Sequence, residues 1–284
     1  MSTVPALFRH LVDDAAMFPP GNLPLADAVA AHRTHRAAPY ADLVGSFVCT
    51  DEDLMKVAAE AARTGPDPLE VSVVITGGAG GIEPAIRWGD RSPDVKVTGV
   101  EVRLRDEEDL SRNALRVVRV CDDCLDNETA YVEVGLDGAW ERALGVIADA
   151  GYAAKLRTGG MDASLFPSED QVAAFITTCL DYEVPFKCTA GLHNAVRHTA
   201  ADSSFEHHGF LNVLLATRAS LDGSSRDELT QILGSRDGNE LAARARELTE
   251  ERAASARKWF TSFGSCSIDE PRQDLNTLNL MGDV

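Results

Sequence analysis

Two lysines stand inside stretches that otherwise resemble buried strands. Lys155 lies in AAKLRTGG and Lys187 in PFKCTAGLH, and the chain has only five lysines. Burial lowers the pKa of a lysine, and a second ammonium group nearby lowers it further. A lysine that is neutral near pH 7 is a nucleophile for carbonyl carbons and can form a Schiff base. The alternative is that each lysine is half-buried and paired with a carboxylate.

Two glutamates have the same kind of setting. Glu101 in GVEVRL and Glu133 in YVEVGL are flanked by valines, and a carboxylate buried between β-branched residues needs a partner or a function. Each could act as a general acid or base, bind a metal ion, or pair with a lysine, and pairing is the simplest choice for either one alone. Four such residues on consecutive strands, however, form a polar constellation that a purely structural core would avoid. This constellation is the feature that most indicates an enzyme.

Residues near the two lysines supply further candidates. His193 ends the turn after Lys187 and could act as an acid or base, although a loop histidine is usually only surface-exposed. Arg157 has the same strand parity as Lys155, and guanidinium groups suit a carboxylate or phosphate on a substrate. For either arginine, a salt bridge to one of the many acidic residues is the alternative. The candidate substrate-binding residues are Arg157, Arg197, Thr189, His208 and Asp14.

Alternating segments along the chain indicate how these residues are positioned. From residue 25 onward, helix-like segments alternate with strand-like ones at 44–50, 69–78, 96–104, 129–136, 152–160 and 184–193. Repeated βα units predict a parallel sheet, closed as a barrel or open and doubly wound. Three helix-like segments and a late strand at 260–268 follow. We therefore expect an α/β fold: a single TIM-like (β/α)-barrel domain over 1–284, with a C-terminal helical insertion at 200–255. The eighth strand is not evident, and a short segment near the N-terminus is the candidate.

A barrel of this kind carries its functional groups at the C-terminal ends of its strands. Neighbouring parallel strands lie roughly 4.8 Å apart. We therefore expect Glu101, Glu133, Lys155 and Lys187 to converge on one cavity at that end. The N-terminal stretch DDAAMFPPG would either plug one end of the barrel or supply Asp14 to the site.

Composition limits the class of partner. The chain has 27 basic and 45 acidic residues and a net charge of −18, which argues against nucleic acid and against an anionic membrane surface. No apolar run reaches membrane-spanning length, and the N-terminus lacks a leader pattern, so we expect a cytoplasmic protein. The expected partner is a small-molecule substrate, and a homo-oligomer is left open.

Three other motifs carry less chemistry. GGAGGIEPA at 77–85 fits no phosphate-binding pattern, and we expect a loop there. CDDC at 121–124 has no second cysteine pair and ends a helical pattern, which predicts reduced helical thiols. The histidines have no zinc-binding spacing. We expect neither a metal ion nor a cofactor.

KLRTGG and FKCTAG resemble the paired lysine strands of the deoxyribose-phosphate aldolase family of class I aldolases, over residues 131–193. The resemblance implies that Lys155 forms the Schiff base and that Lys187 lowers its pKa. The chain departs from that family in its helical insertion, in glutamates where the family has aspartates, and in a last strand matched only by FGSCS. DDAAMFPPG, KLRTGG, FKCTAGLHNAVR and FGSCSIDEP together also resemble an uncharacterised bacterial family of TIM-barrel-like proteins.

We therefore expect a class I aldolase-like lyase that acts on a small carbonyl substrate, with or without an anionic group, through an imine on Lys155. Glu133 or His193 would transfer the protons. One alternative is a divalent-metal isomerase or lyase with Glu101, Glu133 and His193 as ligands and a lysine as base. The other is a non-catalytic ligand-binding protein on the same fold.

Overall fold

The computed structural model describes residues 4–105, 108–200 and 204–282. Within these ranges eight parallel strands close into a barrel in the order β1-β10-β7-β6-β5-β4-β3-β2. They are β1 (Val12–Asp14), β2 (Val44–Thr50), β3 (Leu69–Ile75), β4 (Val95–Arg103), β5 (Thr129–Val134), β6 (Ala153–Arg157), β7 (Phe186–Thr189) and β10 (Phe260–Ser265). The predicted (β/α)-barrel is confirmed.

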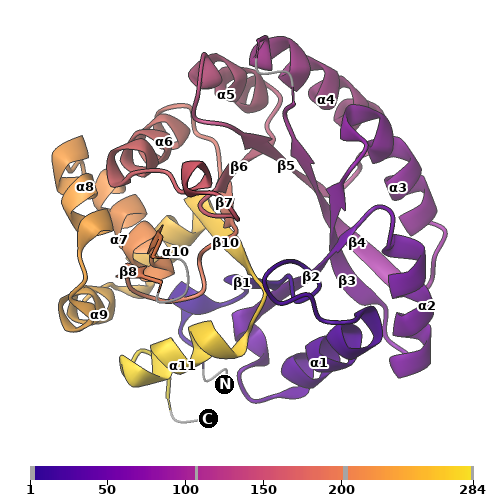
Figure 1. Cartoon of the computed structure of the whole chain (residues 1–284), viewed down its shortest axis with the longest axis horizontal. Helices are drawn as coiled ribbons and strands as arrows, with labels where there is room; N and C mark the ends of the chain where they lie inside the picture. Colours follow the sequence, from indigo (N-terminus) through magenta and orange to yellow (C-terminus); the bar gives the residue numbers. More distant parts are fainter. Residues whose placement is uncertain (1–3, 106–107, 201–203, 283–284) are drawn as a thin grey trace.

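Helices surround the barrel as an outer ring, which Figure 1 shows from above. They are α1 (Leu25–Ala37), α2 (Leu54–Thr64), α3 (Ile82–Gly89), α4 (Leu110–Cys124), α5 (Trp140–Asp149), α6 (Glu169–Asp181), α7 (Phe210–Leu221), α8 (Arg226–Gly234), α9 (Gly238–Arg246), α10 (Glu250–Trp259) and α11 (Asp269–Thr277). Short 3-10 turns are η1 (Ala6–Phe8), η2 (Ala41–Leu43), η3 (Gly78–Gly81) and η4 (Ala163–Leu165). A two-stranded antiparallel sheet consists of β8 (His198–Thr199) and β9 (Glu206–His207).

The N-terminal strand β1 closes the barrel. Val12 pairs with Phe263 of β10 on one side and with Val44 of β2 on the other. The short segment that we sought near the N-terminus is therefore the eighth strand. It has three residues, which is too short for a period of two to show in the sequence.

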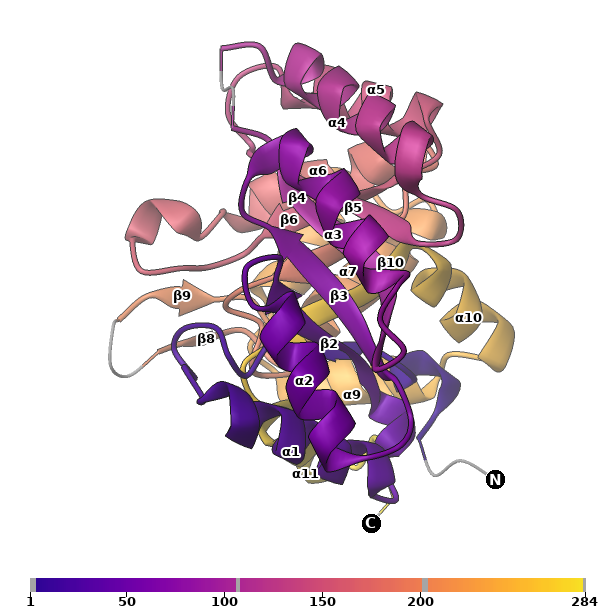
Figure 2. The ribbon, with the colours of Figure 1, turned by 90° about the vertical axis from the view of Figure 1, so that its right-hand side faces the viewer.

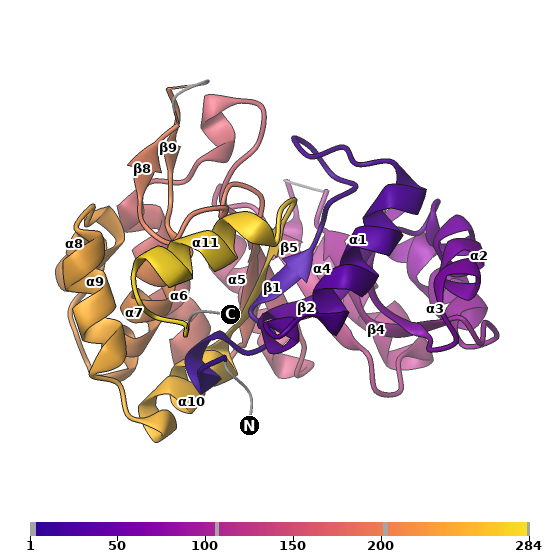
Figure 3. The ribbon, with the colours of Figure 1, turned by 90° about the horizontal axis from the view of Figure 1, so that it is seen from below.

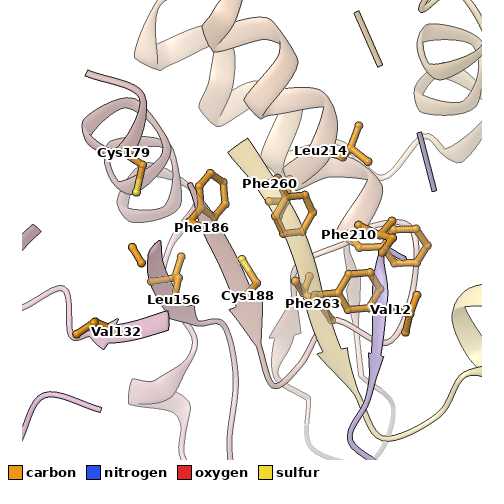
Figure 4. Close-up of a cluster of buried hydrophobic side chains, with 14 of the residues drawn as sticks. Val12, Val132, Leu156, Cys179, Phe186, Cys188, Phe210, Leu214, Phe260 and Phe263 are labelled. Carbon is orange, nitrogen blue, oxygen red and sulfur yellow. The ribbon is translucent and has the colours of Figure 1, made fainter. Parts of the chain in front are cut away.

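The hydrophobic core lies between the barrel wall and the helices. Figure 4 shows part of it, where Phe186, Phe260 and Phe263 from β7 and β10 face the helices α6 and α7. The rings of Phe186 and Phe260 stack with centroids 5.4 Å apart, and those of Phe210 and Phe263 stack at 5.0 Å. Stacked aromatic pairs of this kind add to the free energy gained by burying their area.

Helices α7 to α10 follow one another between β7 and β10, in the part of the chain where we expected the insertion at 200–255. The first of them, α7, is part of the outer ring itself. Every residue from 210 to 218 is buried, and the helix packs against α6, α8, α10 and β10. A helix that is apolar on all sides requires such cover. The helical insertion at 200–255 stays a prediction, and the burial of α7 shows that at least this helix belongs to the core.

The hairpin β8–β9 projects from the C-terminal end of the barrel, where β7 ends (Figures 2 and 3). The first described residues lie towards the opposite end in Figure 3. No helix in the described ranges combines the length and the apolar character that crossing a membrane requires.

Candidate functional site

Strand parity turns both lysines into the barrel. Leu156, next to Lys155, and Phe186 and Cys188, on either side of Lys187, belong to the outer core shown in Figure 4. Successive side chains of a strand point to opposite faces. The two ammonium groups therefore lie inside the barrel, in neighbouring positions of β6 and β7.

The two glutamates point inward for the same reason. Each is flanked by buried valines: Val100, Val102, Val132 and Val134. Glu133 pairs in register with Lys155, whereas Glu101 starts from β4, two strands away from β6. All four predicted residues thus come together inside the barrel.

Glu101 joins the two lysines. Its Oε2 lies 2.7 Å from Nζ of Lys155, and its Oε1 lies 2.7 Å from Nζ of Lys187. The hydroxyl of Ser72 also donates to Oε1, at 2.8 Å. One carboxylate therefore separates the two cations that we expected to face each other.

The ion pairs continue on both sides of Glu101. Lys187 Nζ lies 2.6 Å from Oδ2 of Asp13, and Lys155 Nζ lies 3.0 Å from Oε2 of Glu133. Oε1 of Glu133 in turn accepts from Nε of Arg157 at 3.1 Å. We call this chain of alternating charge the charged network; its members are Asp13, Lys187, Glu101, Lys155, Glu133 and Arg157.

The charged network runs from the buried interior of the barrel towards solvent at the C-terminal end. Asp13, Glu101, Glu133, Lys155 and Lys187 are buried, with Asp13 the most exposed at 6%. The side chain of Arg157, at the C-terminal end of β6, is 35% exposed. Buried charges need partners of opposite sign, and the alternation supplies one to every buried member.

The pKa values of the network follow from this pairing. Burial raises the pKa of Glu101, but Lys155 and Lys187 outweigh it and hold that pKa well below its ordinary value. The pKa of Glu133 is lowered against burial by Lys155 and Arg157. Burial alone would lower the pKa of Lys187, but Asp13 and Glu101 raise it instead. The expectation that the two lysines lower each other's pKa is therefore wrong for Lys187.

Asp13 takes the place that we expected for Asp14. The side chain of Asp13 points inward, where it also accepts from the hydroxyl of Ser262 at 2.7 Å. Asp14 has the opposite parity, and its Oδ2 lies 3.0 Å from Nδ1 of His32 on α1. Asp14 thus faces the helical layer and does not reach the site. The adjacent aspartates gave no sign of which one faces inward, because the strand itself was not recognised.

Thr189 and His193 follow Lys187 towards the C-terminal end of the barrel. Thr189 pairs in register with Arg157 and lies near Gly264. His193 does not touch the charged network. Its Nδ1 lies 3.2 Å from Oε2 of Glu270, 3.4 Å from the Ser265 hydroxyl and 3.6 Å from Sγ of Cys266. Burial lowers the pKa of His193 and Glu270 opposes the shift.

Arg197 and His208 do not belong to the site. The guanidinium of Arg197 lies 2.9 Å from Glu169 on α6, and its Nη1 lies 3.2 Å from Nδ1 of His208. The other ring nitrogen of His208 is 2.7 Å from the carbonyl oxygen of Pro167, and burial lowers the pKa of this histidine to about 4. Both side chains therefore fasten the β8–β9 hairpin to the helices. The salt-bridge alternative is the correct one for Arg197.

The three proposed metal ligands do not converge on one point, because His193 lies apart from the two glutamates. Glu101 and Glu133 are occupied by Lys155, while His193 contacts Glu270 on α11. In the described part of the chain no group of three or more His, Cys, Asp or Glu side chains is arranged to hold a metal ion.

The two remaining motifs have structural positions. CDDC ends α4, where Cys121 is buried and Cys124 half-buried, and both thiols are free. The glycine-rich stretch forms η3 and the start of α3. Part of the segment expected as a loop is therefore helical.

A cavity of about 310 Å³ reaches the charged network from the N-terminal end of the barrel. Lys187 and Asp13 line it, together with residues near the starts of the strands, such as Ser46 on β2 and Ser262 on β10. We expected all four predicted residues around one cavity at the C-terminal end. Only Lys187 of the four borders this one, because its position near the start of β7 places it at the N-terminal side of the network.

Neither a protein-family model nor a curated protein sequence matches the chain. Among solved structures the chain is similar to a provisionally assigned fructose-1,6-biphosphate aldolase from Coccidioides immitis. The two share 10% sequence identity with a TM-score of 0.36, over 91% of this chain and 97% of the other.

Proposed function

We propose that this chain is a lyase of the aldolase type that acts on a small carbonyl compound through an imine on Lys155. The observation that carries the proposal is the position of the Lys155 amine, held between two carboxylates next to the partly exposed Arg157. A carboxylate in contact with an ammonium group can accept its proton and return it later, which general acid–base catalysis requires.

Lys155 suits the role of nucleophile better than Lys187. Lys187 lies at the N-terminal side of the network, away from Arg157, and Asp13 and Glu101 raise its pKa, so it keeps its proton near pH 7. Lys155 and Arg157 are successive inward residues of β6. Lys155 therefore lies nearer than Lys187 to the exposed guanidinium of Arg157. In this scheme Lys187 fixes Glu101, and Glu101 in turn orients Lys155.

The reaction can be written with the residues present. Glu133 accepts a proton from the Lys155 ammonium, and the free amine adds to the carbonyl carbon. Glu133 returns that proton to the carbinolamine hydroxyl, which leaves as water, and a carbon–nitrogen double bond forms. A β-hydroxyl on the substrate then gives its proton to Glu133, the adjacent carbon–carbon bond breaks, and its electron pair moves towards the iminium nitrogen. Protonation of the resulting enamine and addition of water release the second product and regenerate Lys155.

Arg157 would bind an anionic group of the substrate. It has one hydrogen bond to Glu133 through Nε, and its Nη1 lies 3.5 Å from the carbonyl oxygen of Gly159. Guanidinium groups have five N–H donors, so donors remain for a carboxylate or phosphate. Thr189, beside Arg157 in the register, would contact the same group.

Borohydride trapping tests the proposal directly. The protein is incubated with glycolaldehyde, glyceraldehyde or pyruvate, reduced, and analysed by intact mass and by peptide mapping. We expect one adduct per chain, located at Lys155. The Lys155→Ala and Lys155→Arg variants should form no adduct. The exposed Lys56 supplies the matched control, because Lys56→Ala should leave the adduct unchanged.

Two results would overturn the imine mechanism. One is an adduct spread equally over the five lysines, which indicates unselective labelling. The other is full carbon–carbon cleavage activity in Lys155→Ala. Absence of both adduct and turnover with every carbonyl compound tried would favour the non-catalytic alternative.

A further inference from the structure

The cavity at the N-terminal end of the barrel lies on the side opposite to the exposed Arg157. Its wall includes Ser46 near the start of β2, Ser72 in the middle of β3, Tyr131 of β5 and Ser262 of β10. Its volume of about 310 Å³ is at the lower end of the range of small-molecule sites, roughly 300–1,000 Å³. The proposed imine chemistry assigns no role to this space.

The serine hydroxyls on the inner wall of the cavity offer acceptors to a ligand. Ser72 donates its hydroxyl proton to Glu101 at 2.8 Å, and Ser262 donates to Asp13 at 2.7 Å. Both acceptors are carboxylate oxygens that also pair with Lys187, and the serines are the donors. Only the oxygen lone pairs of these two serines remain for a ligand.

Two further hydroxyls of the cavity wall also donate their protons to groups of the protein. Thr98 donates to the carbonyl oxygen of Val71 at 3.0 Å, which commits its proton. Ser46 and Thr98 lie 2.8 Å apart, so Ser46 donates to Thr98. These four hydroxyls therefore offer only lone pairs to a ligand, which suits a molecule with several hydrogen-bond donors of its own, such as a polyol.

The rim of the cavity has the opposite character. Arg36 and His10 both border it, and each contacts the carbonyl oxygen of Val44, at 2.9 Å and 3.2 Å. The acidic rim residue Glu70 is already paired with Lys96 at 2.9 Å, and Lys96, with Arg36 and His10, lowers its pKa. The rim therefore presents the guanidinium of Arg36 and the imidazole of His10, while Lys96 neutralises the charge of Glu70.

We propose that this cavity is a second binding site, for a small polyol that carries one anionic group. The anionic group lies at the rim against Arg36 and His10, and the hydroxyl groups donate to Ser46, Ser72, Thr98 and Ser262. A carboxylate and a phosphate both satisfy the rim. The proposal does not depend on the imine chemistry at Lys155.

Calorimetric titration with a matched set of probes tests the site. The probes are D-erythronate as the hydroxylated carboxylate, erythritol 4-phosphate as its phosphate counterpart, erythritol as the neutral polyol and butyrate as the carboxylate without hydroxyls. We expect at least one of the two anionic polyols to bind at least about tenfold more tightly than erythritol and butyrate, since each lacks one half of the recognition. Comparison of the affinities for D-erythronate and erythritol 4-phosphate shows which anion the rim prefers.

Variants locate the binding. Arg36→Ala should weaken the anionic polyol about tenfold and leave erythritol unchanged, because only the anionic contact is lost. Arg36 is exposed, so this variant is expected to fold. Ser46→Leu should abolish binding of both compounds by filling the cavity. Arg103→Ala, at the C-terminal end of β4, and Arg116→Ala, on the exposed face of α4, are the charge-matched controls and should change neither affinity.

Three results would overturn the proposal. They are the absence of heat with all four probes at millimolar concentration, unchanged binding in Arg36→Ala, and loss of binding in Arg103→Ala instead. The last result would place the ligand at the C-terminal end.

Discussion

On the outer face of the barrel wall, Leu156 and Phe186 pack among apolar side chains of the helical layer. On the inner face, one residue away along the same two strands, Lys155 and Lys187 are held by carboxylates. The outer contacts are non-directional, so a lost side chain leaves only a cavity. The inner contacts are ion pairs between groups of opposite charge, so a lost side chain leaves a buried charge without its partner.

This difference separates two tasks within one set of strands. The outer face stabilises the barrel through buried area, and any apolar residue of suitable size serves there. The inner face holds six charged groups in alternating order, and each position requires a particular sign. The requirement for sign is what makes the inner face suited to chemistry.

The largest effect is expected for Lys187→Met, a change that keeps the length of the side chain and removes its charge. It leaves Asp13 without its cation and Glu101 with only Lys155. We expect the free energy of unfolding at pH 7 to fall by about 3–5 kcal/mol, measured by urea denaturation.

The combined variant Lys187→Met, Asp13→Asn and Glu101→Gln is the control for the charge argument. It removes the uncompensated charges and should recover part of the lost stability. A loss below about 1 kcal/mol in the single variant would show that solvent from the cavity compensates the two carboxylates.

On the outer face, Leu156→Ala should cost about 3 kcal/mol through the cavity that it leaves. No titrating group is involved, so the cost should be the same at pH 5 and pH 7. The cost of Lys187→Met should instead shrink at pH 5, because an unpaired buried carboxylate can take up a proton. Equal pH dependence in the two variants would remove the distinction between the faces.

Acid should weaken the inner face first. The pKa values of Glu101 and Glu133 are lower in the folded chain than in the unfolded chain. Their contribution is therefore fully present above the unfolded value near about 4.3 and is lost as the pH falls towards the folded values. Urea denaturation between pH 7 and pH 3 should show stability falling below about pH 4.5.

Glu133→Gln tests which groups cause the loss of stability below about pH 4.5. It should cost about 1.5–3 kcal/mol at pH 7, since Lys155 and Arg157 each lose a charged partner. It should also make the decline below pH 4.5 shallower, because one of the carboxylates with a lowered pKa is gone. An unchanged slope would assign the loss of stability to other groups.

Repetition made the fold predictable from the sequence. Six strand patterns, five of them followed by a helical one, indicate parallel βα units, and the strand at 260–265 was expected within a few residues. β1 was located only in outline, because three residues cannot display a period. α7 was expected as an addition, although its burial follows from the apolar run FLNVLLATRASL.

Strand parity was the only property of the sequence from which the site could be predicted. Parity placed Lys155, Lys187, Glu101 and Glu133 inside the barrel. It could not show that Glu101 crosses the barrel from β4 to contact β7, because that contact exists only once the sheet has closed. Without it the two lysines appeared to face each other, and the sign of the pKa shift at Lys187 was inferred incorrectly.

The smallest effect on stability is expected for Arg157→Gln at the exposed end of the network. Its side chain is 35% exposed, and Glu133 keeps Lys155 as a buried partner after the change. Partly exposed ion pairs contribute about 0–1 kcal/mol, so the loss in urea denaturation should be below about 1 kcal/mol and should shrink further at high salt. The effect on trapping should be larger and selective: the concentration of pyruvate that half-saturates the Lys155 adduct should rise about tenfold, while that of uncharged glycolaldehyde should not change. An equal rise for both compounds would mean that Arg157 acts on Lys155 through Glu133 and does not bind the anionic group.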